Sequence, residues 1–123
     1  MKILLDTHAF LFWRTDALAG RARELIADPD NEVYLSAASV WEIAIKRGIG
    51  RLRMQGHVAD MAAEDGFVPL AINFEHAQLA GELPRHQRDP FDRLIVAQAL
   101  CEGLVIATRD AAFAQYDVPL IRA

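Results

Sequence analysis

Short apolar runs alternate along this chain with stretches of helical periodicity, and this alternation restricts the possible folds more than any other feature. Five runs predict strands, at residues 2–6, 33–36, 67–72, 104–108 and 118–121. Six stretches predict helices, at residues 17–28, 39–48, 57–65, 74–83, 90–102 and 110–116. Strands that are separated by helices are typical of parallel sheets, because a parallel connection needs a long crossover. The sequence therefore predicts an α/β fold with a mostly parallel five-stranded sheet covered by helices.

Length and composition indicate a compact globular protein. The chain has 123 residues, and 53% of them are hydrophobic, which is enough to bury a core in one domain. No apolar run approaches the roughly 18–20 residues that cross a membrane. Cys101 is the only cysteine, so an intramolecular disulfide is impossible and a reducing compartment fits best. We therefore expect a single domain over residues 1–123, in the cytoplasm and without a membrane segment.

Four acidic residues lie where predicted elements meet. Asp6 ends the first strand, and Asp110 follows the fourth. Glu42 and Asp92 lie near the starts of two predicted helices. Ligands of parallel α/β sheets bind beyond the carboxyl ends of the strands. The four acids therefore predict a carboxylate cluster at this edge of the sheet.

Helix capping is the alternative explanation for three of these acids. Asp6 and Asp110 each precede a segment whose first N–H groups they would cap. The segment from Ser39 to Glu42 matches a capping box, in which the glutamate returns to the serine N–H. Glu42 would also pair with Lys46 one turn later. Because one carboxylate can cap a helix and bind a cation through its other oxygen, capping does not exclude the cluster.

Of the four acids, Asp92 has the weakest purely structural explanation. Asp89 and Pro90 already form a good helix start, with Asp89 as the N-cap and Pro90 in the first turn. Asp92 then heads a helix face that continues with Ile95 and Val96. A charge that points toward the interior is costly unless it is paired. We therefore expect Asp92 to face a metal ion or a cationic side chain.

A cluster of carboxylates needs bound cations or protonated members. Two carboxylates about 4 Å apart repel each other by ~4 kcal/mol at an effective dielectric of 20. Oxygen-only ligands suit Mg²⁺ or Mn²⁺, and the chain has neither zinc-ligand spacing nor a GxxxxGK[ST] phosphate loop. With no obvious nucleophile, the simplest chemistry is attack on phosphorus by metal-activated water. The cluster therefore indicates metal-dependent phosphodiester hydrolysis.

The net charge of −4 does not exclude a nucleic-acid substrate. The chain has 17 acidic residues and 13 Lys and Arg, so the remainder is close to neutral once the four clustered acids are set aside. Arginine suits bidentate contacts with phosphate. Arg93 and Arg109 lie next to proposed acids in the sequence and are candidate phosphate-binding residues, with ordinary solvated surface as the alternative.

Four sequence blocks resemble those of PIN-domain ribonucleases of the VapC toxin type. The blocks are LLDTHAFLFW (residues 4–13), SAASVWEIAIK (36–46), RDPFDRLIVAQA (88–99) and ATRDAAF (107–113). They lie in the order and spacing of that family and span nearly the whole chain. The resemblance implies a PIN-like three-layer α/β/α fold and a Mg²⁺- or Mn²⁺-dependent endoribonuclease.

The resemblance also implies roles for individual residues. The family's catalytic and metal-binding acids fall on the four residues named above: Asp6, Glu42, Asp92 and Asp110. Thr108 matches the family's Thr or Ser before the last acid, where it would bind a metal-bound water. Thr7 would support the metal site from beside Asp6. The family further implies a homodimer and a cognate antitoxin protein as partners, with RNA as the substrate.

Other functions remain possible on the residues alone. A receiver-like signalling domain would need an adjacent acid pair and a lysine after a late strand, and Lys2 and Lys46 are both misplaced for it. A degenerate PIN domain would act only by binding partners. A metal-dependent phosphohydrolase would use the same acids on small phosphate esters. The target RNA stays open among transfer, ribosomal and messenger RNA, since loops would read its shape and its unpaired bases.

Overall fold

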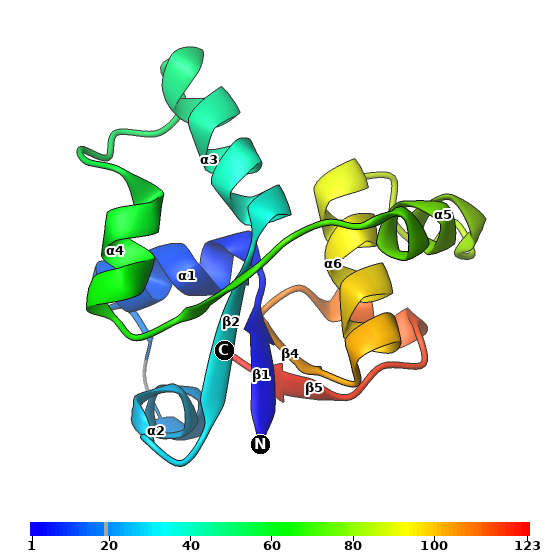
Figure 1. The fold of residues 1–123 in the computed structure, drawn as a ribbon, viewed down its shortest axis with the longest axis horizontal. Helices are drawn as coiled ribbons and strands as arrows, with labels where there is room; N and C mark the ends of the chain where they lie inside the picture. The colour runs from blue at the N-terminus through cyan, green and yellow to red at the C-terminus, as the bar shows by residue number, and fades with distance from the viewer. Residues whose placement is uncertain (19) are drawn as a thin grey trace.

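The computed structural model describes residues 1–18 and 20–123, and the strands of this part form one parallel sheet (Figure 1). The strand order is β3-β2-β1-β4-β5, and each neighbouring pair runs parallel. The strands are β1 (Lys2–Leu5), β2 (Glu32–Ser36), β3 (Val68–Leu70), β4 (Val105–Thr108) and β5 (Leu120–Arg122). The prediction of a mostly parallel five-stranded sheet is confirmed.

Helices connect the strands. They are α1 (Thr7–Arg14), α2 (Gly20–Ala27), α3 (Ala37–Gly48), α4 (Val58–Glu64), α5 (Phe74–Glu82) and α6 (Pro90–Glu102), with a short 3-10 helix η1 (Ala111–Gln115) before β5. The helix predicted at 17–28 is thus observed as α2, and residue 19 lies outside the described residues. Among the described residues, no helix is long and apolar enough to cross a membrane.

The sheet separates two hydrophobic cores, which gives the predicted α/β/α layers. One core joins the sheet to α1, α2 and α4, and the other joins it to α5, α6 and η1. The central strand β1 serves both, because Ile3 and Leu5 belong to the first core and Leu4 to the second. Side chains alternate between the faces of a strand, and these three of the four residues of β1 are fully buried. Figure 1 shows the two helical layers on opposite sides of the strands.

Helix α1 was missing from the predicted elements. It spans eight residues. Asp6 was considered as the N-cap of a following helix, and it does cap α1. A helix this short is marginal by itself, so burial of Ala9 and Phe10 against the sheet stabilises it. This stabilisation depends on the tertiary structure.

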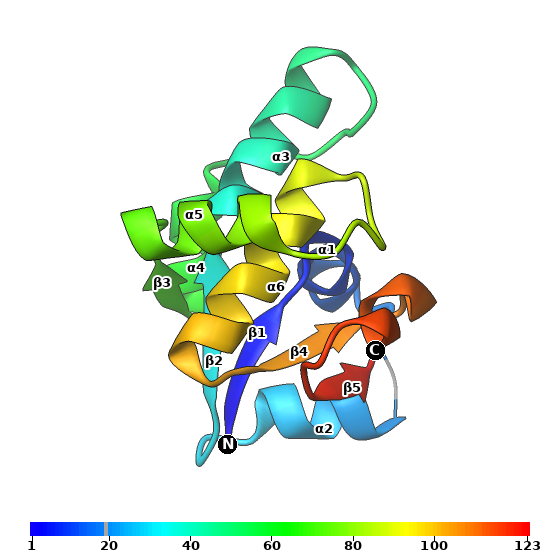
Figure 2. The same ribbon diagram turned by 90° about the vertical axis from the view of Figure 1, so that its right-hand side faces the viewer.

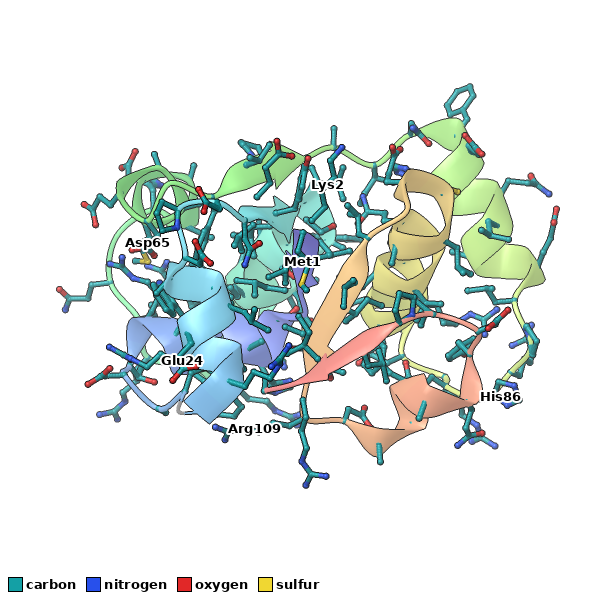
Figure 3. The ribbon with its side chains drawn as sticks, turned by 90° about the horizontal axis from the view of Figure 1, so that it is seen from below. Met1, Lys2, Glu24, Asp65, His86 and Arg109 are labelled. Atoms are coloured by element: carbon teal, nitrogen blue, oxygen red, sulfur yellow. The ribbon has the colours of Figure 1, made fainter. Side chains whose placement is uncertain are left out.

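Three helices begin around the carboxyl edge of the sheet. Helices α1 and α3 directly follow β1 and β2, and α6 begins beside α3 (Figure 2). Figure 3 looks onto the opposite edge, where Met1 and Lys2 mark the start of β1. The predicted acids belong to the edge at which these helices begin.

Gly103 provides a test of how α6 ends. It adopts φ 68° and ψ 44° as the C-cap of α6, a left-handed conformation that disfavours a Cβ. We expect Gly103→Ala to lower the free energy of unfolding by about 1 kcal/mol. Gly81→Ala is the matched control, since Gly81 lies in α5 with open space around it; it should raise stability by up to ~1 kcal/mol. Urea unfolding of both variants measures the difference, and equal effects would contradict the assignment.

Candidate active site

Asp6 lies at the carboxyl end of the central strand and caps α1. Its Oδ1 accepts a hydrogen bond from the Ala9 N–H at 2.7 Å, and its Oδ2 accepts one from Thr108 Oγ1 at 2.6 Å. The side chain is buried, with 3% exposed. Burial raises the pKa of the Asp6 carboxyl, although these two hydrogen bonds oppose the increase. The predicted capping role of Asp6 is confirmed, whereas the expected role of Thr108 in binding a metal-bound water stays a prediction.

Glu42 joins α3 to α1. Its Oε1 accepts a hydrogen bond from Thr7 Oγ1 at 2.6 Å, and its Oε2 pairs with Lys46 Nζ at 2.8 Å. The glutamate is 5% exposed. Thr7 is also buried, and its Oγ1 lies 3.0 Å from Ser39 Oγ. Because the single Thr7 hydroxyl proton is directed to Glu42, Ser39 is the donor in this contact. The pair with Lys46 was expected, whereas the contact with Thr7 brings together residues 35 positions apart.

The predicted capping box between Ser39 and Glu42 is wrong. Helix α3 begins at Ala37, and Ser36 is its N-cap, with its Oγ accepting the Ala38 N–H at 2.9 Å. Ser39 therefore lies inside the first turn. Ser36 offers the same capping chemistry three residues earlier, directly at the end of β2, and the strand end decides which serine is used. Glu42 is consequently free of any capping role.

Asp92 lies in the first turn of α6, half-buried at the same edge. Asp89 caps this helix as expected, because its Oδ1 accepts the N–H groups of Phe91 and Asp92 at 2.8 and 3.2 Å. Burial raises the pKa of Asp92 to about 7, and the negative charges of four other acids add to the increase: Asp89, Glu42, Asp6 and Asp110. No hydrogen bond from the described residues offsets this increase. Asp92 is thus the least compensated charge of the group.

Asp110 lies after β4 and is exposed. Its Oδ1 accepts the Ala112 N–H at 2.9 Å and so caps η1, while its Oδ2 accepts a hydrogen bond from Gln87 Nε2 at 3.3 Å. The backbone N–H of Asp110 donates to Thr108 Oγ1 at 3.0 Å. Thr108 therefore connects Asp110 to Asp6. Gln87, which no sequence pattern had singled out, is a further neighbour of the site.

Arg93 does not occupy the position expected of a phosphate-binding residue. Its side chain is buried, and its two terminal nitrogens donate to four backbone carbonyls: those of Ala80, Leu83, Pro84 and Gln87. The guanidinium thereby fastens the end of α5 and the following loop to α6. This placement favours a structural role over the predicted phosphate contact, because the donors are already used.

Arg109 is likewise engaged within the chain. Its Nη2 donates to the Ala17 carbonyl at 2.8 Å and its Nε to the Ala123 carbonyl at 3.0 Å. The guanidinium carbon lies 3.8 Å from the centre of the Phe12 ring, a favourable cation–π contact. These contacts tie the loop before α2 to the C-terminal strand and do not favour the predicted phosphate contact.

The four acids lie near one another, but they are not arranged as a complete set of metal ligands. Among residues 1–18 and 20–123, no group of three His, Cys, Asp or Glu side chains is arranged to hold a metal ion. The chemistry of the donors nevertheless fits a hard cation, since all are oxygens and Asp92 lacks a compensating partner. The buried Gln87 Oε1, beside Asp110, also has no hydrogen-bond partner in the described chain. The residues present therefore suit a magnesium-like ion in kind and charge.

The raised pKa of Asp92 predicts how stability depends on pH without divalent metal. Its pKa is 3.8 when unperturbed and about 7 in the fold, so the unfolded chain loses this proton first as pH rises. The contribution of Asp92 to stability therefore falls between pH 4 and pH 7 and is constant above that. Asp92→Asn should remove this loss and be more stable than the original protein by on the order of 2 kcal/mol at pH 8. Thermal unfolding of both proteins in EDTA at pH 4, 6 and 8 measures this difference in stability. If the stability of both proteins changed with pH by the same amount, the partly buried position of Asp92 would be contradicted.

Arg93 predicts a large effect on stability. Arg93→Met keeps the apolar stem and removes the donors to four carbonyls, so we expect a loss of ~3 kcal/mol or more in the free energy of unfolding. Arg88→Met is the matched control, because Arg88 is exposed on the loop before α6. Urea unfolding compares the two variants. If both variants lost the same small amount of unfolding free energy, Arg93 would again be a candidate phosphate-binding residue.

Comparisons with known proteins agree with the fold. Residues 3–119 match the family model described as the PIN domain. A chain of FitAcB from Neisseria gonorrhoeae is 24% identical, with a TM-score of 0.66 and coverage of 98% of this chain and 96% of that one. A chain of VapBC2 from Rickettsia felis, bound to a DNA fragment from its promoter, is 15% identical, with a TM-score of 0.69 and coverage of 98% of both chains.

A third solved structure is a toxin–antitoxin complex from Klebsiella pneumoniae, at 19% identity and a TM-score of 0.68, covering 98% of this chain and 96% of that one. At these identities the structural likeness concerns the fold. A search of curated proteins found no match. The family model, however, spans nearly the whole chain. The protein belongs to the PIN-domain family.

Proposed function

We propose that this PIN-domain protein is a metal-dependent endoribonuclease and the toxin of a toxin–antitoxin pair. The observation that carries the proposal is the environment of Asp92. Its charge has no compensating hydrogen bond in the described chain. Burial raises its pKa most, and the charges of Asp89, Glu42, Asp6 and Asp110 add to the increase. Carboxylates brought together in this way are stable as anions only with a cation among them. Metal-dependent hydrolysis of a phosphodiester uses such a cation.

The four acids would hold Mg²⁺ or Mn²⁺ at the carboxyl edge of the sheet. When bound, the ion would lower the pKa of a water molecule and offset charge on the phosphate. The chain's own contribution is the orientation of the ligands. Thr7 and Thr108 each donate a hydrogen bond to one oxygen of Glu42 and Asp6, at 2.6 Å in both cases. Such outer partners fix the direction of the acid side chains and typically affect metal affinity by 10–100-fold.

Lys46 limits the negative charge of the cluster. Its Nζ lies 2.8 Å from Glu42 Oε2, and the lysine is itself partly exposed. A phosphate arriving at the site would find this one cation next to the acids. Lys46 therefore stands in the place where the sequence had suggested arginines.

The role as a toxin is supported by the known structures that share the fold. The Klebsiella pneumoniae structure is a toxin–antitoxin complex. VapBC-5 from Mycobacterium tuberculosis, which shares 21% identity and a TM-score of 0.63 over 99% of this chain and 98% of that one, belongs to a family of toxin–antitoxin systems. On this basis we propose a cognate antitoxin protein as partner, a homodimeric assembly and a cytoplasmic RNA substrate.

The test is cleavage of total cellular RNA by purified, antitoxin-free protein. We expect cuts at discrete positions with Mg²⁺ or Mn²⁺ and none with EDTA. Asp92→Asn should reduce the rate by at least about a hundredfold, because it removes a ligand charge. Asp60→Asn is the matched control, since Asp60 is an exposed acid at the third position of α4, as Asp92 is in α6. Asp60→Asn should cut like the original protein.

Other outcomes separate the alternatives. Equal activity of Asp92→Asn and Asp60→Asn would remove Asp92 from the site. Absence of cleavage with either metal would favour a degenerate PIN domain that acts by binding partners. Release of inorganic phosphate from small phosphate esters, with RNA left intact, would favour a phosphohydrolase.

A further inference from the structure

An exposed tryptophan lies beside the acid cluster. Trp41 directly precedes Glu42 on α3, and Phe91 directly precedes Asp92 on α6. The two rings meet edge to face, with centroids 5.4 Å apart and an interplanar angle of 77°. Because successive residues of a helix point about 100° apart, the rings lie next to the acids without being among them. The aromatic pair therefore bridges α3 and α6 at the rim of the proposed site.

The tryptophan is held in place and yet open to solvent. Phe91 packs against the Trp41 ring, but 59% of the Trp41 side chain remains exposed. An exposed large aromatic residue that is fixed by a neighbour loses little freedom when a ligand covers it. Trp41 also lines an apolar groove of about 550 Å³ between α3, α4 and β3, together with Leu35, Val40, Pro69 and Leu70. A flat apolar group could therefore lie against Trp41 at the end of this groove.

Positive charge follows the tryptophan along the same helix. Residues 46–53, which we call the basic segment, contain Lys46, Arg47, Arg51 and Arg53, and no acid occurs between residues 43 and 59. Arg51 and Arg53 are exposed, and neither forms a salt bridge in the described chain. The basic segment begins about 8 Å beyond Trp41, at 1.5 Å per residue. In a protein of net charge −4, such a segment is a local site for anions.

We propose that Trp41 stacks on an unpaired base of a single-stranded RNA whose phosphates contact the basic segment. This site would place the neighbouring phosphodiester at the acids, and it rests on the proposed function. Aromatic side chains bind bases of any sequence by stacking, and basic residues along a groove follow the backbone. The combination of an exposed ring, an apolar groove and unpaired arginines is the chemistry that recognises such a strand.

A protein segment would be the other candidate for this surface. Ile45 and Ile49 extend the exposed apolar face of α3, and both are suited to protein contacts. The charge pattern favours RNA, because the arginines that follow need a partner rich in negative charge. The position favours RNA as well, since Trp41 and Phe91 each adjoin a proposed catalytic acid in the sequence. The test therefore measures RNA binding and self-association on the same variants.

The experiment measures binding without cleavage. Fluorescein-labelled 12-nucleotide single-stranded RNA of randomised sequence is titrated with Asp92→Asn protein in EDTA, and the fluorescence anisotropy gives the Kd. Adding Trp41→Ala should weaken binding about tenfold or more, and Trp41→Phe should stay within about threefold, because it keeps a stacking ring. Phe74→Ala is the matched control, since Phe74 is 95% exposed on α5; it should bind like the parent. Arg51→Gln with Arg53→Gln should weaken binding and reduce its dependence on salt.

The outcomes distinguish this proposal from the proposed function. An unchanged Kd for Trp41→Ala, with its thermal stability intact, overturns the stacking site even when the original protein cleaves RNA with Mg²⁺. If Trp41→Ala changes self-association, measured by sedimentation velocity, and leaves RNA binding intact, Trp41 belongs to a protein interface. That result also overturns the stacking site. If the original protein fails to cleave RNA, the proposed function fails, whereas Trp41-dependent binding would still support the site. In cleavage assays, Trp41→Ala should raise KM with kcat little changed.

Discussion

The burial of carboxylates near one another, at one edge of the sheet, is the constraint around which this structure is arranged. Parallel strands and the helices beside them bring Asp6, Glu42, Asp92 and Asp110 to the same region. Burial, with a further contribution from the neighbouring acids, raises the pKa of Asp92 to about 7. Two threonine hydroxyls and one lysine offset part of this cost at Asp6 and Glu42. The arrangement is tolerated because two cores on opposite faces of the sheet hold the helices in place.

A buried polar network links the helices that carry the acids. Gln98 on α6 is fully buried, and its Oε1 accepts a hydrogen bond at 2.5 Å from Ser36 Oγ, the N-cap of α3. Gln98 Nε2 donates to the Ala71 carbonyl at 3.2 Å and lies 3.4 Å from Nδ1 of the buried His76. A buried amide is tolerated only when its groups are bonded. These contacts fix the start of α3 against α6, and so the helix of Glu42 relative to that of Asp92.

Local patterns predicted most of the elements, and they placed Asp6 after β1 and Asp110 after β4, as observed. The strands were recognisable as apolar runs, and α6 was recognisable from Asp89, Pro90 and the final Gly103. The errors fall where tertiary contacts decide. Helix α1 is stabilised by its burial against the sheet, and Ser36 replaces Ser39 as the cap because β2 ends there. Neighbouring positions in the sequence suggested phosphate contacts for Arg93 and Arg109, yet both guanidinium groups bind backbone carbonyls.

Apolar periodicity and the residues at element ends are local properties, so the sequence alone was enough to predict the α/β class, the parallel sheet and the acids at its carboxyl edge. The partner of each polar group, in contrast, depends on tertiary packing. Thr7 meets Glu42 across 35 residues, and Thr108 meets Asp6 across 102. The burial that sets the pKa of Asp92, and the contact between Trp41 and Phe91, likewise depend on how α3 and α6 pack. Such pairings follow from the packing of distant segments, which no local pattern of residues encodes.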